Sequence, residues 1–328
     1  MRFIVANYGT RHLGLLLAHL ESVARSHPQA THSVYWQDIP ERFISALRAA
    51  FPRAEWIRTE FDFAHDPIQR ISSKVLCWAR AAEDHAGDDA LVFCDSDTLV
   101  RRDVSGFFSA ADADVIFTTK PENVPLNTGV MLAHGGAAAT AFFHAWREAT
   151  LAILRTPSEY AKANDASFPY GGTDQMSLYQ LLGYSREQDR YTLSLSDDSA
   201  SSISVRLRAE PCARLNETNS RPLADDIHIV HYKAGWQSIL LDGRPFSRFR
   251  PRDASWEMFA YFLETLSAAL ARVNTATGEH FTARDFRIQQ PWYYRAGKFN
   301  SWAYAAWRVR AALCRAWLLA TGRLQPGM

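Results

Sequence analysis

Short apolar runs alternate with segments of helical apolar spacing along the first half of the chain. The runs predict strands at residues 2–6, 33–36, 54–59, 90–95, 114–118 and 129–133. In other segments apolar residues recur every three or four positions, which predicts helices at residues 13–23, 40–51, 67–85 and 137–154. Strands that alternate with helices indicate an α/β fold with a mostly parallel sheet and helices on both faces.

The second half of the chain has weaker periodicity. Residues 185–225 are polar and rich in serine and arginine, so we expect an irregular excursion there before a last strand at residues 227–232. We expect one main domain over residues 1–250, followed by a helical, basic and aromatic C-terminal appendage over residues 251–328.

The composition is that of an ordinary globular protein, with 47% hydrophobic and 22% charged residues among 328. No apolar run reaches the roughly 18 residues that indicate a membrane span, and the first residues lack the apolar stretch of a secretory signal. The cysteines are widely separated and show no zinc-type spacing, which predicts reduced, buried thiols. We therefore expect a cytoplasmic protein.

Charge is unevenly distributed, although the net charge is only +1. After Asp285 the chain has seven lysines and arginines and no acidic residue, and residues 289–323 mix six of these cations with tryptophan and tyrosine. That mixture suits an anionic membrane surface, so we expect peripheral binding at the inner face of the cytoplasmic membrane. A C-terminal helix packed on the domain is the alternative, and we expect no nucleic acid as a partner.

The strongest chemical signal is ALVFCDSDTLVRRD, residues 90–103, in which an apolar strand ends in two acids. Strand periodicity places Asp95 and Asp97 on one side of an extended segment, with Ser96 facing away. Two carboxylates this close repel each other unless a proton or a cation lies between them. Mg²⁺ or Mn²⁺ would fit, with other positions left to water and phosphate oxygens. The sequence thus predicts a metal–diphosphate site at the carboxyl end of the sheet.

Three other interpretations of this segment are open. A solvated turn often contains Asp-x-Asp, although the apolar residues on both sides argue against it here. A phosphatase of the haloacid-dehalogenase type also has Asp-x-Asp after a strand, with Thr118 and Asp225-Asp226 as its later motifs, but Leu99 stands where that motif has Thr or Val. A non-catalytic sugar-nucleotide-binding protein is the third alternative.

Four segments in chain order resemble glycosyltransferases of the GT-A fold. They are CDSDTLVRRDVSGFF (94–108), PLNTGVMLAH (125–134), GGTDQMSLYQLL (171–182) and HIVHYKAGW (228–236). The combination is most similar to glycosyltransferase family eight, the retaining enzymes that include bacterial lipopolysaccharide galactosyl- and glucosyltransferases. The resemblance implies transfer of a sugar from a nucleotide-sugar donor, commonly a UDP-sugar, to a glycan or glycolipid acceptor.

The resemblance further implies that Mn²⁺ (or Mg²⁺) binds to Asp95, Asp97 and His231, the last through a neutral imidazole nitrogen. The metal would stabilise the charge that develops on the departing diphosphate. Lys233 and the backbone of Gly235 would support the phosphates, although the family pattern places the glycine before the lysine.

By the same resemblance, Asn127, Asp174 and Gln175 would form the catalytic pocket for sugar and acceptor. Gln175 would lie near the anomeric carbon and Asp174 would orient sugar hydroxyls; retention of configuration is inferred from this pair. Asp174 also suits the first turn of a helix, with Thr173 as its N-cap.

A further set of residues would contact the donor: Asn7, Tyr8, Asp38, Lys74 and Ser96. Asn7 and Tyr8 end the first strand, with Tyr8 as a stacking surface for the base, and Asp38 follows the second strand. Lys74 would supply a cation near the donor from the helix before the acidic segment. A solvated helix charge is equally compatible with its position in the sequence.

Overall fold

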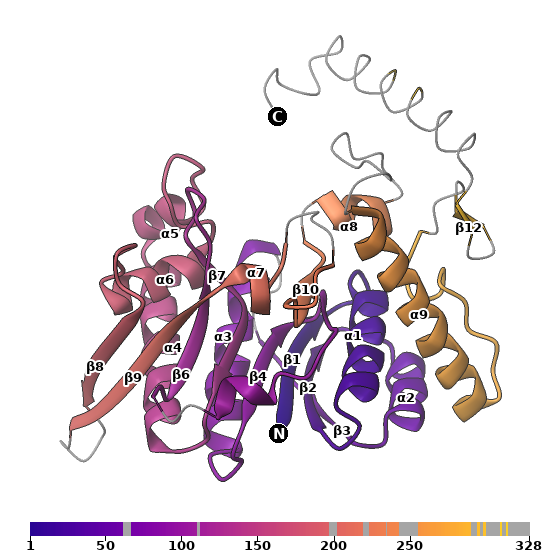
Figure 1. Ribbon diagram of the computed structural model, residues 1–328, viewed down its shortest axis with the longest axis horizontal. Coiled ribbons are helices and arrows are strands. Elements are labelled where there is room, and N and C mark those ends of the chain that lie inside the picture. Colours follow the sequence, from indigo (N-terminus) through magenta and orange to yellow (C-terminus); the bar gives the residue numbers. More distant parts are fainter. Residues whose placement is uncertain are drawn as a thin grey trace.

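An eight-stranded sheet forms the centre of the molecule (Figure 1). The structure, a computed structural model, describes residues 1–61, 67–109, 112–196, 202–218, 223–233, 235–242 and 255–289, and isolated positions at 294–295, 298–299, 309 and 313. In spatial order the strands are β3 (Ala54–Arg58), β2 (Thr31–Gln37), β1 (Arg2–Tyr8), β4 (Leu91–Asp95), β7 (Leu126–Ala133), β6 (Val115–Thr119), β9 (Ser202–Pro211) and β8 (Arg190–Ser196).

The strands β3, β2, β1 and β4 run parallel, so their carboxyl ends meet at one edge of the sheet. β7 is antiparallel to both β4 and β6, β6 is parallel to β9, and β8 is antiparallel to β9. The predicted α/β fold is confirmed, as a mixed sheet whose N-terminal half is parallel.

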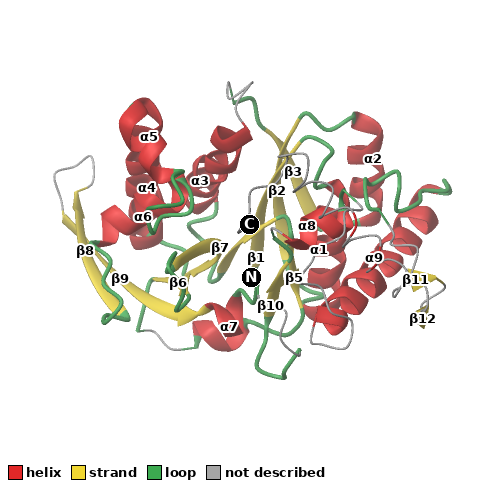
Figure 2. Cartoon of the chain, turned by 90° about the horizontal axis from the view of Figure 1, so that it is seen from above, coloured by secondary structure: helices red, strands yellow, loops and turns green. Residues whose placement is uncertain are grey.

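Helices cover both faces of the sheet, with an apolar core under each layer (Figure 2). One layer consists of α1 (Leu13–Ser26), α2 (Glu41–Ala50) and α9 (Ser255–Thr277), and the other of α3 (Pro67–Asp84), α4 (Ala137–Arg155) and α6 (Thr173–Leu182). Successive residues of β1 face opposite layers: Val5 packs under the first and Ile4 under the second. Both are fully buried, which explains the continuous apolar run in the sequence.

The expected irregular excursion at residues 185–225 is wrong, because β8 and β9 form an antiparallel pair there. Apolar residues face each other at alternate positions, as in the pairs Tyr191–Leu207 and Leu193–Val205, and polar residues occupy the positions between them. The period of two was present in the sequence, but the serine- and arginine-rich composition concealed it.

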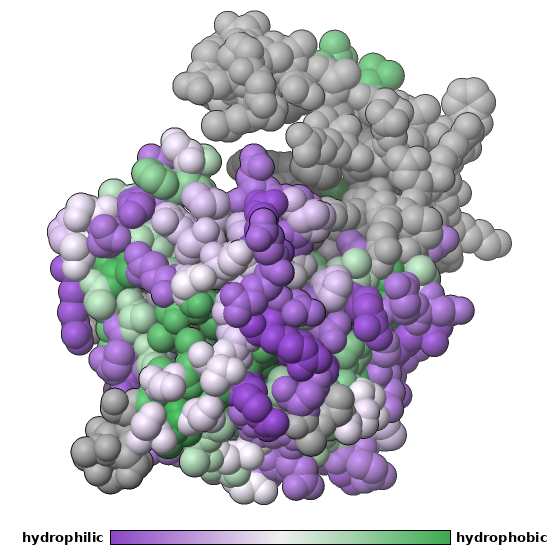
Figure 3. All heavy atoms as spheres, turned by 60° about the vertical axis from the view of Figure 1, so that its left-hand side comes forward, coloured by the Kyte–Doolittle hydropathy of each residue, from purple (hydrophilic) through white to green (hydrophobic). Residues whose placement is uncertain are grey.

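On the face shown in Figure 3, hydrophobic residues lie in scattered areas between hydrophilic ones.

A second, two-stranded sheet joins distant parts of the chain. β5 (Thr98–Val100) follows the acidic segment, and it pairs antiparallel with β10 (Ile229–His231). Short elements complete the described fold: α5 (Pro157–Ala163), α7 (Cys212–Leu215), α8 (Gly235–Leu240), the 3-10 helix η1 (Ser105–Phe108), and the strands β11 (Tyr294–Arg295) and β12 (Lys298–Phe299).

α9 packs on α1 and α2, where Phe259 and Phe262 are fully buried in the same core.

The predicted domain boundary at residue 250 lies outside the described residues, as does nearly all of the tail at 289–323, so both stay predictions. Cys77, Cys94 and Cys212 are free and buried, as expected. Among the described helices, none is both long and apolar enough to cross a membrane.

Candidate functional site

A cavity of about 620 Å³ lies where the carboxyl ends of β1 and β4 approach the first turn of α6. Most of the residues predicted from the sequence line it: Asn7, Tyr8, Lys74, Asp95, Ser96, Asp97, Asn127, Asp174, Gln175, His231 and Lys233. Asp38 does not line it. Residues from six separate parts of the chain are therefore brought together at one site.

Asp95 and Asp97 reach the cavity through a turn and not through an extended segment. β4 ends at Asp95, Ser96 and Asp97 form the turn, and β5 begins at Thr98. The Thr98 hydroxyl donates a hydrogen bond to the Asp95 carbonyl at 2.8 Å, which closes the turn. The expected strand alternation is wrong here, and Ser96 lines the cavity instead of facing away. Both carboxylates nevertheless point to one site.

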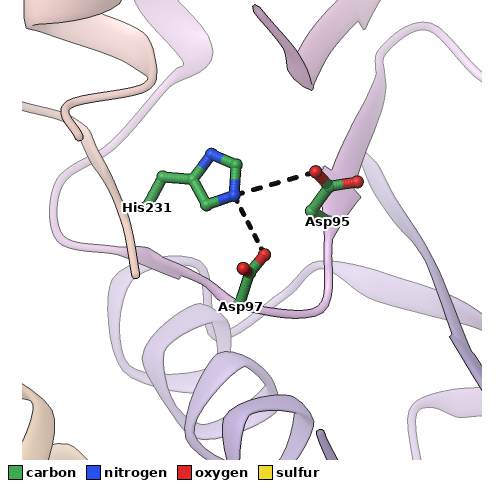
Figure 4. A group of neighbouring side chains, drawn as sticks. All are labelled: Asp95, Asp97 and His231. Carbon is green, nitrogen blue, oxygen red and sulfur yellow. Dashed lines mark ion pairs between the residues drawn. The ribbon is translucent and has the colours of Figure 1, made fainter. Parts of the chain in front are cut away.

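β10 places His231 beside this turn. His231 pairs with Thr98 in the β5–β10 register. Its Nε2 lies 3.0 Å from Oδ1 of Asp97 and 3.7 Å from Oδ2 of Asp95 (Figure 4). One ligand atom from each of the three residues lies within 4.8 Å of the others, so a single cation could contact all three. Carboxylate oxygens with one imidazole nitrogen are a donor set that fits Mn²⁺ or Mg²⁺.

Burial and the neighbouring charge shift the pKa of Asp97 in opposite directions. Burial raises the pKa of its carboxyl, but the adjacent His231 outweighs burial, and the pKa lies well below the ordinary value. Gln237 of α8 donates a hydrogen bond from Nε2 to Oδ2 of Asp97 at 2.7 Å. His12, the residue before α1, lines the same part of the cavity, and burial lowers its pKa. Asp97 is therefore held as a carboxylate, the form that can bind a cation.

Lys74 forms a second charged cluster that uses the other oxygen of Asp95. Its Nζ lies 2.8 Å from Oδ1 of Asp95 and 3.1 Å from Oδ2 of Asp174. Thr128 accepts a hydrogen bond from Nζ through its carbonyl at 3.2 Å and donates its hydroxyl to Oδ2 of Asp174 at 2.5 Å. Burial alone would lower the pKa of Lys74, but the two carboxylates raise it well above its ordinary value. Lys74 is thus a buried ion-pair partner and not a solvated helix charge.

Gly129, in the segment PLNTGVMLAH, packs directly against the imidazole of His231. A Cβ at this position would overlap the ring and approach Oδ2 of Asp95 to 3.1 Å, so only glycine leaves room for the two candidate ligands. Asn127 precedes it, and its Oδ1 accepts a hydrogen bond from the Gly129 N–H at 3.2 Å. The Asn-x-Gly pattern therefore has a local physical reason.

The N-terminus of α6 brings Asp174 and Gln175 to the cavity. The N-cap is Gly172, with a φ of 145°, and Thr173 is the first helical residue, so the expected cap at Thr173 is wrong. Gln175 donates from Nε2 to the carbonyl of Gly171 at 3.0 Å. This contact fixes the orientation of the side-chain amide and leaves its Oε1 without a partner among the described residues.

Several cavity-lining residues carry a buried polar atom that has no hydrogen-bond partner among the described residues. They are Asn7 (Oδ1), His12 (Nε2), Asn127 (Nδ2), Thr173 (Oγ1) and Gln175 (Oε1). Buried polar groups without partners are rare and costly in folded proteins. At the cavity, such atoms suit a polar ligand with hydroxyl, carbonyl or phosphate groups.

The remaining predicted residues divide between the cavity and the surface. Tyr8 lines the cavity and its hydroxyl lies 3.1 Å from Sγ of Cys77, while burial raises its pKa well above the ordinary value. Asp38 is exposed after β2 with a φ of 56°, a conformation that aspartate tolerates better than most residues. Gly235 begins α8. Roles for Asp38 and Gly235 in donor binding stay predictions.

The structure does not support the phosphatase alternative. Thr118 donates its hydroxyl to the carbonyl of Asn127 at 2.6 Å and is not among the cavity-lining residues. Asp225 is 92% exposed and forms an ion pair with Arg102. Neither residue can therefore act on a phosphate bound at Asp95.

Sequence reasoning missed several residues of the site: His12, Thr128, Asn216 and Gln237. Asn216 is fully buried behind His231, with Oδ1 at 2.8 Å from Nδ1 of the imidazole. Nothing local marks it, because it lies in a polar segment just after α7. Gln237 directly follows the segment HIVHYKAGW, so extending that segment by one residue would have included it.

Comparison with solved structures returns glycosyltransferases. GlyE from Streptococcus pneumoniae TIGR4 is 16% identical with a TM-score of 0.50, over 84% of this chain and 63% of that chain. Its apo form gives 16% identity and a TM-score of 0.51, over 85% of this chain and 64% of that chain. The galactosyltransferase LgtC, in complex with donor and acceptor sugar analogs, is 14% identical with a TM-score of 0.45, over 82% and 96% of the two chains.

The chain has the GT-A glycosyltransferase fold. Its eight-stranded sheet with flanking helices confirms the fold expected from the sequence. This chain spans a little under two thirds of the length of the GlyE chains that it matches. No protein-family model matches the sequence, and no curated protein matches it.

Proposed function

We propose that the protein is a metal-dependent glycosyltransferase of the family-eight type. It would transfer a sugar from a nucleotide-sugar donor, a UDP-sugar, to a glycan or glycolipid acceptor with retention of configuration. The observation that carries this proposal is the convergence of Asp95, Asp97 and His231 on one point of the cavity, in a chain with a glycosyltransferase fold. Mn²⁺ or Mg²⁺ bound there would stabilise negative charge on the diphosphate leaving group.

The donor's nucleoside and phosphates would contact the β1 side of the cavity. Asn7 donates from Nδ2 to the carbonyl of Gly9 at 3.1 Å, so its free Oδ1 can accept a hydrogen bond from a base or ribose. Tyr8 stays a neutral phenol and offers a stacking surface. Lys233 faces the cavity, where burial and the nearby Lys120 lower its pKa. An anionic diphosphate would compensate for both effects, which supports its contact with Lys233.

The transferred sugar would lie between Asn127 and the N-terminus of α6. Asp174 uses Oδ2 to bind Thr128 and Lys74, so we assign it to orientation of the site rather than to attack on the sugar. Gln175 presents the unpartnered Oε1, an acceptor that can support a developing positive charge at the anomeric carbon. This arrangement supports retention of configuration.

The acceptor would approach along the loop between α5 and α6. Phe168 is 39% exposed and its ring stacks on Tyr170, with ring centroids 6.0 Å apart. The same loop ends at Gly171 and Gly172, which line the cavity. An exposed aromatic surface beside a polar cavity suits the apolar face of a sugar ring in a glycan or glycolipid. The basic tail at residues 289–323 would hold the protein against an anionic membrane, at the inner face of the cytoplasmic membrane.

The decisive experiment is a thermal-shift series with UDP, GDP, CDP and their sugars, each with and without Mn²⁺. We expect a nucleoside diphosphate to raise the melting temperature only when Mn²⁺ is present, because the cation bridges protein and phosphates. Asp97→Ala should abolish this shift, whereas Asp89→Asn, at an exposed acid away from the cavity, should retain it.

An equal response to all phosphates, or the same response without metal, would contradict the proposal. A metal-dependent shift with no turnover of any UDP-sugar, to acceptor or to water, would instead identify a non-catalytic sugar-nucleotide-binding protein. Release of UDP measured on the same samples separates these two outcomes.

A further inference from the structure

Asn216 is fully buried behind the candidate metal ligand His231 and directly follows the short helix α7 as its C-cap. Its Oδ1 lies 2.8 Å from Nδ1 of His231. Its Nδ2 lies 2.9 Å from the hydroxyl oxygen of Thr118 and 3.3 Å from the carbonyl oxygen of Asn127. All polar atoms of this side chain therefore have partners, and none of them faces solvent.

The partners fix which way the Asn216 amide points. A carbonyl oxygen only accepts hydrogen bonds, so the Asn127 carbonyl requires the NH₂ group of Asn216 on its side. The Thr118 hydroxyl donates to the same carbonyl at 2.6 Å, so its oxygen is left to accept from that NH₂ group. Oδ1 of Asn216 must then face His231. An amide oxygen cannot donate, so Nδ1 of His231 has to carry the hydrogen.

With hydrogen on Nδ1, the lone pair of the neutral imidazole is on Nε2. That nitrogen faces Oδ1 of Asp97 at 3.0 Å and Oδ2 of Asp95 at 3.7 Å. Three electron-pair donors then point at one place, an arrangement that a cation stabilises. In the opposite tautomer Nε2 would carry the hydrogen and would have no lone pair for a cation.

We propose that Asn216 is a positioning residue that sets the tautomer and ring orientation of His231, so that Nε2 is the nitrogen presented to the metal. This inference rests on the proposed metal-dependent function. Thr118 and the Asn127 carbonyl hold the Asn216 amide in place, and Gly129 leaves space for the ring beside Cε1 and Nδ1. Groups behind a metal-binding histidine act in this way in many metal sites.

The test is the affinity of the full chain for Mn²⁺ without donor, measured by electron paramagnetic resonance of free Mn²⁺. Asn216→Leu keeps the size of the side chain but cannot accept from Nδ1, and we expect about 10- to 100-fold weaker binding. Asn216→Asp keeps the acceptor, so its affinity should stay within about threefold of the parent, although a carboxylate facing the Asn127 carbonyl lowers the melting temperature. Asn274→Leu removes a partly buried amide that bridges the backbone of Phe281 at 2.7 and 3.1 Å, remote from the cavity, and should leave the Mn²⁺ affinity unchanged.

A second measurement needs no variant. In ¹⁵N-histidine-labelled protein with Mg²⁺, nuclear magnetic resonance should show the hydrogen of His231 on Nδ1; hydrogen on Nε2 would overturn the inference. Equal affinity of parent and Asn216→Leu, or equally weak binding by Asn216→Asp and Asn216→Leu, would also overturn it. If the parent protein binds no Mn²⁺ at all, the proposed function fails first, and the role of Asn216 fails with it.

Discussion

Two charged clusters share Asp95 in one cavity, and they differ in how their charges are balanced. On one side, Lys74 lies between Asp95 and Asp174, and Thr128 adds further hydrogen bonds. On the other side, Asp97 and Asp95 face the single imidazole of His231. The first cluster contains its own cation, whereas the second presents acceptors to a place where a metal ion would fit. The protein thus balances the charges of the first cluster by itself, whereas a bound cation would balance those of the second under the proposed function.

This difference has a physical origin in the cost of burying charge. A buried ion pair with good geometry keeps its charges compensated, and removal of one partner leaves the other uncompensated. In the second cluster only the imidazole of His231 offsets two acids, and such an arrangement is typical of a site that binds a cation. Substitutions in the Lys74 cluster should therefore mainly reduce the free energy of unfolding. Substitutions at Asp97 should mainly reduce activity.

The largest expected effect is on the stability of the Lys74 cluster. Lys74→Met removes the cation between two buried carboxylates, and we expect the free energy of unfolding to fall by about 3–5 kcal/mol. Urea unfolding measures this change. Arg80→Met, on the same helix, removes an exposed i,i+4 pair with Asp84 and should cost less than about 1 kcal/mol. Similar losses for both variants would show that Lys74 is no more important for stability than an exposed surface pair.

Asp97→Asn should show the reverse pattern. It relieves the repulsion between two crowded acids but also removes the charged partner of His231, so the metal-free protein should lose less stability than Lys74→Met does. Transfer activity should fall at least about 100-fold, because a ligand of the metal is lost. Initial rates of UDP release at saturating Mn²⁺ measure the effect, with Asp89→Asn as the control. A large loss of stability with little loss of activity would reverse our assignment of the two clusters.

Gly129→Ala tests the space around His231. The added methyl group would overlap the imidazole, so the ring must leave its position beside the two acids. We expect about 10-fold weaker Mn²⁺ binding, by the same titration as for Asn216. Gly106→Ala places a methyl group where nothing lies within 4 Å, and it should bind Mn²⁺ like the parent. Parent-like affinity in Gly129→Ala would show that the ring position is not critical.

The smallest expected effect is the change in the free energy of unfolding per pH unit that comes from two buried imidazoles without a carboxylate partner. Burial lowers the pKa of His19 to about 4 and that of His32 to about 3. The unfolded chain binds protons below pH 6.5 while these folded imidazoles stay neutral. Stability is thus complete above pH 6.5 and falls as the pH decreases toward 4, by at most about 1.4 kcal/mol per unit for each imidazole.

His32→Leu should make this pH dependence less steep, because one of the two imidazoles no longer titrates. Urea unfolding at pH 7.5, 6.5, 5.5 and 4.5 measures the slope for both proteins. An unchanged slope would show that His32 does not contribute.

The local pattern of the sequence was enough to predict much of the fold. β4 and its two acids, the apolar faces of α1 and α4, and the parallel order of the first strands all follow from periodicity over a few residues. Periodicity failed where composition masked it, at β8 and β9, and where a turn replaced the expected extended segment, at Ser96 and Asp97.

The sequence by itself also determined which groups could bind a cation, since Asp95, Asp97 and His231 are recognisable from their segments. Only the tertiary structure decided how those groups are used. The β5–β10 pairing brings His231 to the acids, α3 carries Lys74 between Asp95 and Asp174, and Asn216 orients the imidazole from a segment without any local signal. The physical reason is that apolar periodicity depends on neighbours along the chain. Charge balance and hydrogen-bond direction depend on neighbours in space, and these can be more than a hundred residues apart in the sequence.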